Sequence, residues 1–165
     1  MKKLCLFSIL SIFAIGGLQA QGNLEASAEV GIVIGDASDF TSLSLGVALA
    51  YLFEVSDDFQ AGPSIGYTNY FGKDLDVGNI TFKTDDFGVV PILAKGQYAV
   101  SDEFEAEGGV GYAVFTGDGG GGELTWRLGI NYEFADAWDA AAGYNSITGN
   151  GGSIDAFFVG VRRTF

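Results

Sequence analysis

Apolar and polar residues alternate along most of the chain after Gln21. From Leu24 to Ile34 every second residue is apolar, and the residues between them include Glu25 and Glu29. A period of two is typical of a β-strand with one apolar face, because successive side chains of a strand point to opposite sides. The alternation recurs and predicts eight strands, over residues 24–34, 43–55, 59–67, 90–100, 104–114, 124–134, 138–144 and 157–165.

Two kinds of connection take turns between these strands. Short turns around Asp57, Asp102 and Asp136 are flanked by aromatic residues, whereas the other connections are Gly- and Asp-rich. The Gly- and Asp-rich loops cover residues 35–41, 72–86, 117–122 and 148–153. Three turns and four loops are what eight up-and-down strands need when both chain ends lie on one side. The predicted fold class is all-β, an eight-stranded antiparallel up-and-down barrel closed by its first and last strands.

The alternation alone does not show whether the apolar face lines the inside of a soluble barrel or faces lipid. The opposite face carries mainly Gly, Ala and Ser, which fit the narrow interior of an eight-stranded barrel. After residue 20 the chain contains only Lys73, Lys83 and Lys95, too few lysines for the charged exterior of a soluble barrel. These features predict a transmembrane barrel, and a soluble periplasmic, lipocalin-like ligand-binding barrel is the alternative.

Aromatic residues also favour the membrane, because they cluster at the strand ends next to the short turns. Amphipathic rings prefer the boundary between lipid and water. The predicted interface aromatics are Phe53, Phe59, Tyr98, Phe104, Tyr132 and Trp138. In this orientation Leu45, Val110 and Leu128 face hydrocarbon.

The first twenty residues predict an export signal. Two lysines precede an apolar run over residues 4–15, and Ala20 offers a cleavage position. The expected division is therefore a signal peptide over 1–20 and a barrel over 21–165. Cleavage removes Cys5, the single cysteine, so we expect no disulfide. A retained membrane anchor is the alternative, but the run is shorter than the roughly 20 residues of a spanning helix.

Charge and composition exclude several classes of function. The chain has 21 Asp and Glu against 8 Lys and Arg, a net charge of −13, so it lacks the basic clusters that bind nucleic acid. With no His, it cannot form a His-based triad or a His-ligated zinc site. A paired-carboxylate hydrolase would have to use Glu105 and Glu107, which face a crowded interior. We predict no enzyme activity, no catalytic residues, no cofactor and no metal.

Charged residues on the face opposite the apolar one are predicted to point into the barrel. An isolated buried charge costs several kcal/mol, so Lys95, Arg127 and Arg162 should pair with carboxylates there. The predicted charge network comprises Glu25, Glu29, Glu54, Lys95, Glu105, Glu107, Arg127, Glu133 and Arg162, with Asp139 beside them. Such a network plugs the lumen. The alternative is a narrow channel for water, ions or small solutes.

Acidic residues are frequent in the predicted long loops and near them. They are Asp36, Asp39, Asp74, Asp76, Asp85, Asp86, Asp118, Glu123 and Asp155. Carboxylates of this kind can bridge divalent cations to phosphorylated lipopolysaccharide, or they can form ordinary solvated loops.

Two prolines and one apolar pair mark irregular places. Pro63 and Pro91 fall within predicted strands, where a missing N–H breaks a ladder bond, so they predict bulges or irregular pairing. Ile80 and Phe82 suggest that the fourth strand extends beyond the membrane, where an overhanging strand pair could be an interaction surface.

The last nine residues, Phe157 to Phe165, end on an aromatic residue with apolar residues at alternate positions before it. With Gly160, Val161 and Phe165, this stretch resembles the C-terminal signal by which bacterial outer-membrane barrels are recognised by their assembly machinery. Arg163 departs from that pattern, which usually has an aromatic or aliphatic residue there. Together with the export signal and the eight-strand layout, the chain resembles the opacity/OmpX-like family of small outer-membrane β-barrel proteins.

The resemblance implies a place in the bacterial outer membrane after export through the periplasm. It also implies contact with outer-membrane lipid and lipopolysaccharide, recognition by the barrel assembly machinery, and a structural or adhesion-type role. It does not identify an extracellular ligand. A few lipid-modifying enzymes share this barrel size, but as families they rely on a His-containing catalytic group, which this chain lacks.

Overall fold

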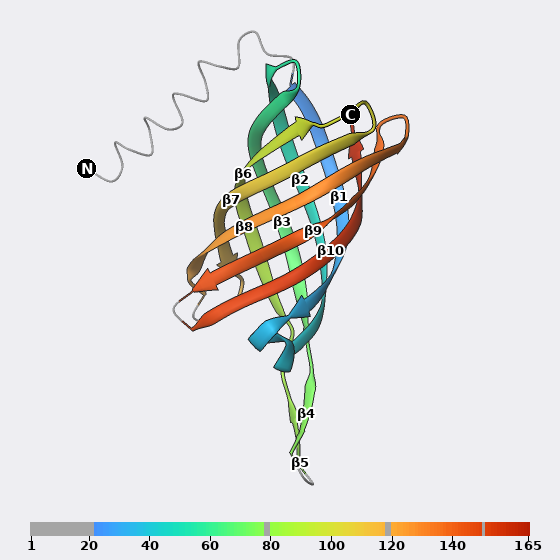
Figure 1. Ribbon diagram of the computed structural model, residues 1–165. Coiled ribbons are helices and arrows are strands. Elements are labelled where there is room, and N and C mark those ends of the chain that lie inside the picture. Colours follow the sequence, from blue (N-terminus) through green and yellow to red (C-terminus); the bar gives the residue numbers. More distant parts are fainter. Residues whose placement is uncertain (1–21, 78–79, 118–119, 150) are drawn as a thin grey trace, which may run out of the picture.

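The computed structural model describes residues 22–77, 80–117, 120–149 and 151–165. The predicted signal peptide and Asp118 lie outside these residues. Eight strands form a closed antiparallel barrel (Figure 1): β1 (Gly22–Ile34), β2 (Thr41–Ser56), β3 (Phe59–Gly72), β6 (Phe87–Ala99), β7 (Phe104–Phe115), β8 (Gly122–Ala135), β9 (Trp138–Gly149) and β10 (Gly152–Thr164). All eight predicted strands are confirmed, and several extend further than the apolar pattern does.

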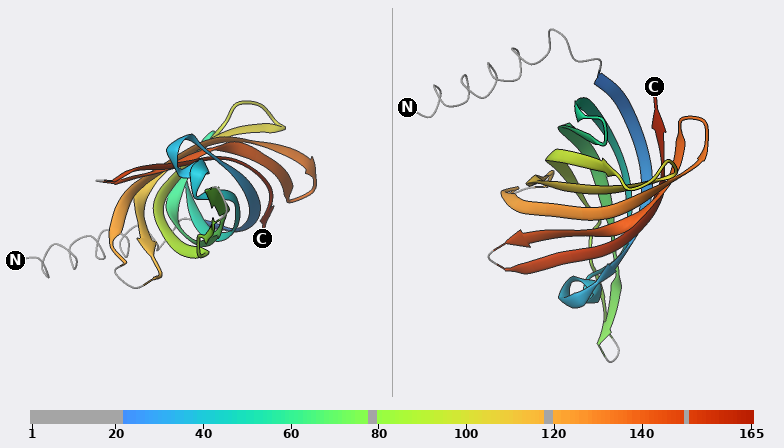
Figure 2. Two further views of the ribbon diagram at one scale, coloured as in Figure 1. Left: turned by 90° about the horizontal axis from the view of Figure 1, so that it is seen from below. Right: turned by 45° about the horizontal axis from the view of Figure 1, so that its top comes forward.

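Closure of the barrel depends on β1, which pairs with β2 on one side and with β10 on the other. The β1–β10 ladder runs from Glu25 opposite Thr164 to Ile34 opposite Asp155. The predicted pairing of first and last strands is therefore confirmed. It leaves the barrel no open edge, which matters in lipid because hydrocarbon offers no partner for an unpaired backbone group. Figure 2 shows the barrel from two further directions.

The two ends of the barrel differ. The short β2–β3, β6–β7 and β8–β9 turns lie at one end together with the start of β1 and the C-terminus; we call this the turn end (Figure 1). The opposite, loop end carries η1 (Gly35–Asp39) and a hairpin of β4 (Asp74–Val77) and β5 (Ile80–Lys83). η1 is a short 3₁₀ helix. In the described part of the chain, no helix is long and apolar enough to cross a membrane.

Part of the Gly- and Asp-rich connection predicted over residues 72–86 forms the β4–β5 hairpin, an overhanging strand pair. Ile80 and Phe82 lie in β5, but β5 is not an extension of β6, because it ends at Lys83, before β6 begins at Phe87, and pairs with β4 in a separate sheet. The base of the hairpin is closed where the backbone N–H of Gly72 donates to the Asp86 carboxylate at 2.9 Å. The hairpin projects away from the barrel (Figure 1).

We expect removal of this hairpin to leave the barrel intact. Replacing residues 74–83 with a Gly-Ser link should change the free energy of unfolding by less than about 1 kcal/mol, because loop-closure entropy depends weakly on length. Urea unfolding of both forms in lipid vesicles measures the difference. A much larger loss would show that the hairpin contributes contacts to the barrel.

The apolar face of the barrel points outward. Leu45, Val110 and Leu128 are 51%, 54% and 60% exposed, while the side chains of Arg127 and Glu29 are 15% and 17% exposed. The barrel has an apolar exterior and a charged interior. A soluble lipocalin-like barrel has the opposite arrangement, with its apolar face inside and its polar face in water. The prediction of a transmembrane barrel is therefore confirmed over its soluble alternative.

Both prolines coincide with gaps in the strand ladders. Pairing of β2 with β3 stops between Ala50–Ser64 and Phe53–Ala61, on either side of Pro63. The β3–β6 ladder has a similar gap at Pro91. Neither gap is accompanied by a register shift, so the prolines cause irregular pairing and not bulges.

Candidate functional site

Ion pairs fill the middle and the turn-end part of the barrel interior. They join carboxylates of β1, β7 and β9 to cations of β6, β8 and β10, so six of the eight barrel strands contribute. The members are Glu25, Glu29, Lys95, Glu105, Glu107, Arg127, Asp139 and Arg162, which we call the lumen network. Each of these residues was placed on the inner face by its position in the alternation.

The lumen network is connected from one side of the barrel to the other. Lys95 Nζ lies 3.0 Å from Glu25 Oε2 and 3.1 Å from Glu107 Oε2. Arg127 Nη2 lies 2.9 Å from Glu107 Oε1 and 3.0 Å from Glu29 Oε2. Glu107 therefore bridges two cations, and its side chain is only 3% exposed. Because Glu25 and Glu29 belong to β1, these contacts cross the lumen to β6 and β8.

Arg162 anchors the part of the network nearest the turn end. Its Nε donates to Asp139 Oδ2 at 2.9 Å, its Nη1 lies 3.4 Å from Glu25 Oε1, and its Nη2 contacts Glu105. The Arg162 side chain is 4% exposed. Two amides complete the network: Gln97 donates to Glu25, and Asn131 donates to Glu107. No sequence argument singled out these amides, although both occupy the inner face.

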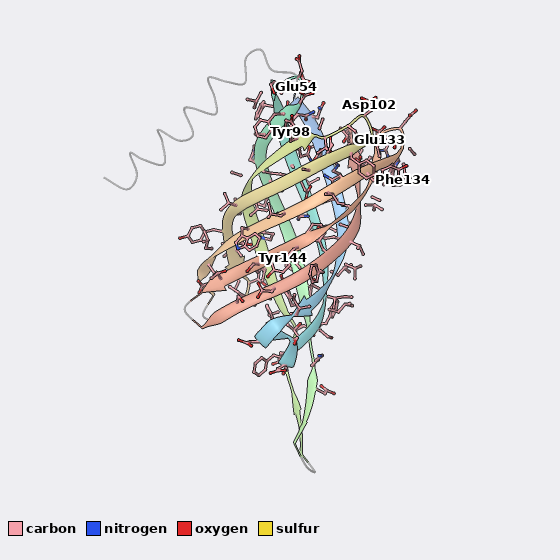
Figure 3. All side chains as sticks on the ribbon, viewed as in Figure 1. Glu54, Tyr98, Asp102, Glu133, Phe134 and Tyr144 are labelled. Carbon is pink, nitrogen blue, oxygen red and sulfur yellow. The ribbon has the colours of Figure 1, made fainter. Side chains whose placement is uncertain are left out.

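Two predicted members lie outside the lumen network. Glu54 and Glu133 are exposed and lie at the turn end of the barrel (Figure 3). Glu54 pairs in register with Gln60, and Glu133 pairs in register with Asp139 of the lumen network. Cross-strand partners point to the same face of a sheet, so both glutamates keep the inward direction that the alternation predicts. They lie at the open turn end of the barrel, where solvent reaches them, and among the described residues neither forms an ion pair. The alternation therefore predicted the face of both residues but not their place outside the network.

Small residues make room for the long charged side chains. A Cβ at Gly46 would lie 3.2 Å from Glu29 Cγ, and a Cβ at Gly129 would lie 3.2 Å from Glu107 Cγ. Both contacts are tighter than ordinary van der Waals packing, so a larger residue would push the carboxylates aside. The Gly and Ala on the inner face thus fit around the network.

An apolar layer closes the interior towards the loop end, and the sequence argument missed it. Its buried members are Val33, Tyr70, Val89, Ala113, Ile147 and Ala156. Phe87 packs against the layer, its ring stacked on Tyr70 with 5.0 Å between centroids. On the turn-end side of this layer the Arg127 guanidinium lies 4.2 Å from the ring centroid of Phe158, where the apolar layer meets the lumen network. The sequence does contain a sign of this layer, because apolar residues occupy several positions on the face that the alternation predicts to be polar.

At the level of the lumen network the barrel interior is narrow. The cavity within the lumen network has a volume of about 20 Å³, room for about one water molecule. Two larger cavities lie at the ends of the barrel: about 470 Å³ at the turn end, lined by Glu105, Glu133 and Asp139 among others, and about 300 Å³ at the loop end.

The two carboxylates that a hydrolase would have to use are both engaged in ion pairs. Glu105 contacts Arg162 while Glu107 contacts Lys95 and Arg127, so the two candidates for a hydrolase are held in different ion pairs. In the part of the chain that the structure describes, no three potential metal ligands gather. Among the loop acids, Asp155 accepts a hydrogen bond from Ser153 at 2.5 Å.

The predicted interface aromatics lie at or near the turn end, and Tyr98 is labelled there in Figure 3. Phe104 and Tyr132 pack together with 4.9 Å between ring centroids. Arg163, the departure from the assembly pattern, lies 5.4 Å from the ring centroid of Trp138 and 4.8 Å from that of Phe165. Its charge is therefore accommodated among aromatic rings on the outer face.

Solved structures similar to this chain include bacterial outer-membrane barrels and designed transmembrane β-barrels, whereas no protein-family model and no curated protein matches its sequence. Ail of Yersinia pestis is 15% identical, with a TM-score of 0.58 over 87% of this chain and 98% of Ail. The N-terminal β-barrel domain of Pseudomonas aeruginosa OprF is 17% identical, with a TM-score of 0.58 over 89% of this chain and 100% of that domain. A designed transmembrane β-barrel is 15% identical, with a TM-score of 0.57 over 87% of this chain and 95% of that one. The chain therefore has the fold of the small outer-membrane β-barrels.

Proposed function

We propose that the chain is an integral protein of the bacterial outer membrane, with a plugged lumen and a structural or surface-binding role, and without catalysis. The observation that carries this proposal is the combination of an apolar exterior with an ion-paired interior. Residues 1–20 would direct export through the periplasm, and residues 21–165 would form the barrel in contact with lipid and lipopolysaccharide.

The direction of insertion follows from the two ends of the barrel. In bacterial outer-membrane barrels the short turns face the periplasm and the longer loops face the exterior. The turn end would then be periplasmic and the loop end extracellular. Val161 on the outer face of β10 and Phe165 directly after this strand are 43% and 65% exposed, where the assembly machinery could bind them before the barrel closes.

The lumen network supports a plug in preference to a channel. A charge that enters the lumen must displace ion pairs that link β1 to β6 and β8, and the cavity between them holds about one water molecule. The apolar layer at the loop end adds a second barrier. The alternative is a narrow channel for water, ions or small solutes, which conductance measurements distinguish from a plug.

The loop end is the surface available to an extracellular partner. Ail has been crystallised with the heparin analogue sucrose octasulfate, a polyanion. In this chain the loop end carries Asp36, Asp39, Asp74 and Glu123, so a polyanion would be repelled there. The partner should therefore be neutral or cationic.

The proposal predicts three results for the protein expressed in a Gram-negative host. It should fractionate with the outer membrane, migrate differently on gels before and after boiling, and give no step conductance in planar bilayers. Boiling should change the migration because a closed barrel stays folded in detergent until it is heated. A porin prepared in the same way serves as the conductance control. Recovery in the soluble periplasmic extract would contradict the membrane assignment, and stable current steps would establish the channel instead.

A further inference from the structure

A cleft of about 300 Å³ opens at the loop end, between η1 and the loop-end parts of β7, β8, β9 and β10. Phe115, Ile147 and Ile154 line it and also belong to the apolar layer or pack against it. The apolar part of the cleft is therefore backed by packed side chains. Phe40 adds a further apolar surface and is 55% exposed. An exposed aromatic residue over an apolar floor is typical of a ligand site.

Two carboxylates line the same cleft, Asp36 from η1 and Glu123 from β8. None of the described residues that line it is basic. Among the cations whose side chains the structure describes, none forms an ion pair with either carboxylate, and Lys73 instead donates to the carbonyl of Ser38 at 2.8 Å. The electrostatic potential of the cleft is therefore negative, which attracts a cation and repels an anion.

Glycines keep this cleft open. A Cβ at Gly149 would lie 2.6 Å from both carboxylate oxygens of Glu123, so the carboxylate occupies the space that a side chain would take. At Gly151 a Cβ would meet nothing within 4 Å. Gly152 has a φ of 130°, which other residues rarely adopt. The carboxylate and the apolar floor can thus both be reached by a ligand.

We propose that this cleft binds a small organic ammonium ion whose charge interacts with Asp36 and Glu123 and whose apolar body covers Phe115, Ile147 and Ile154. A volume of about 300 Å³ lies at the small end of ligand pockets. An inorganic cation would leave the apolar floor uncovered, and a neutral apolar molecule would leave two carboxylates without a partner. The inference rests on the proposed function only in placing the loop end outside the cell.

The first test titrates benzylammonium into the ¹⁵N-labelled barrel in phosphatidylcholine nanodiscs, observed by amide chemical shifts. We expect saturable shifts in η1, at Glu123 and around Ile147 and Ile154, with a dissociation constant in the millimolar range typical of so small a ligand. Benzyl alcohol, its uncharged analogue, should bind at least about tenfold more weakly. Equal binding of the alcohol would overturn the role of the carboxylates. Shifts confined to the lipid-facing surface would show partition into lipid and overturn the site.

Variants separate the charged and apolar contributions. Asp36→Asn and Glu123→Gln should each weaken benzylammonium binding about threefold, and the double variant about tenfold. Asp39→Asn is the matched control, because Asp39 is also in η1 but does not line the cleft. Gly151→Lys should compete by placing a tethered ammonium at the cleft, whereas Gly151→Gln should not. Unchanged affinity in the double variant would contradict the proposal.

Magnesium chloride tests whether Asp36 and Glu123 bind an inorganic cation instead of an organic one. At matched ionic strength Mg²⁺ should not displace benzylammonium, since no three acidic ligands gather among the described residues. Displacement would make the acidic pair an inorganic cation site and overturn the assignment. These measurements use purified protein in nanodiscs, so their outcome does not depend on fractionation. A failed proposed function and a failed cleft assignment can therefore be told apart.

Discussion

Replacing Leu128 with Arg should destabilise the folded barrel in a lipid bilayer by about 2–4 kcal/mol, the cost of a charge at the bilayer midplane on the lipid-facing side of a barrel. Leu128 is 60% exposed and lies near the middle of β8, so the introduced guanidinium would enter hydrocarbon. The measurement is reversible urea unfolding in phosphatidylcholine vesicles, followed by gel mobility.

Tyr132→Arg is the matched control for this experiment. Tyr132 lies on the same strand and the same face, four residues closer to the turn end, and is 40% exposed. An Arg there should cost no more than about 1 kcal/mol, because its side chain reaches the interface. Equal and small effects at both positions would mean that water, and not lipid, covers the apolar face, which would contradict the transmembrane orientation.

Replacing Arg162 with Met should cost about 3–5 kcal/mol of folding free energy, because removing one partner of a buried ion pair leaves uncompensated charge behind. Three carboxylates, those of Glu25, Glu105 and Asp139, contact this guanidinium. Met retains much of the volume and removes only the charge and the hydrogen bonds. Urea unfolding in vesicles again gives the difference in free energy.

The neighbouring residue supplies the control for Arg162→Met. Arg163→Met changes the same chemistry on the opposite face of β10, where Arg163 is exposed among aromatic rings, and should cost less than about 1 kcal/mol. Adding Asp139→Asn to Arg162→Met should recover part of the stability, since one unpaired carboxylate is then removed. An Arg162→Met barrel as stable as the parent would show that the lumen network does not hold the strands together.

Much of the architecture can be predicted from the sequence because strand periodicity is a local property. Alternating residues point to opposite faces whatever the rest of the chain does, so the eight strands, their connections and the placement of Glu29 and Arg127 on one face follow from the pattern alone. Predicting that Leu45 points outward required two further observations, the aromatic residues near the short turns and the small number of lysines. Both observations can be made from the sequence alone.

The ion-pair partners were decided only by the tertiary structure. Lys95 bonds to Glu25 across 70 positions of sequence, and Arg127 bonds to Glu29 across 98. Such contacts depend on ladder register, strand order and barrel closure, which are properties of all strands together. A local period carries no information about them.

The same reason explains where the prediction failed. Glu54 and Glu133 lie at the solvent-exposed turn end (Figure 3), outside the lumen network, although the alternation gives their face correctly. The shared level of Val33, Tyr70 and Ile147 creates an apolar layer that no single strand reveals. The sequence by itself determined the strands and the two faces of the wall, because each residue's neighbours along the chain settle them. Closure of the barrel alone decided which inward side chains meet, because it brings distant strands to one level.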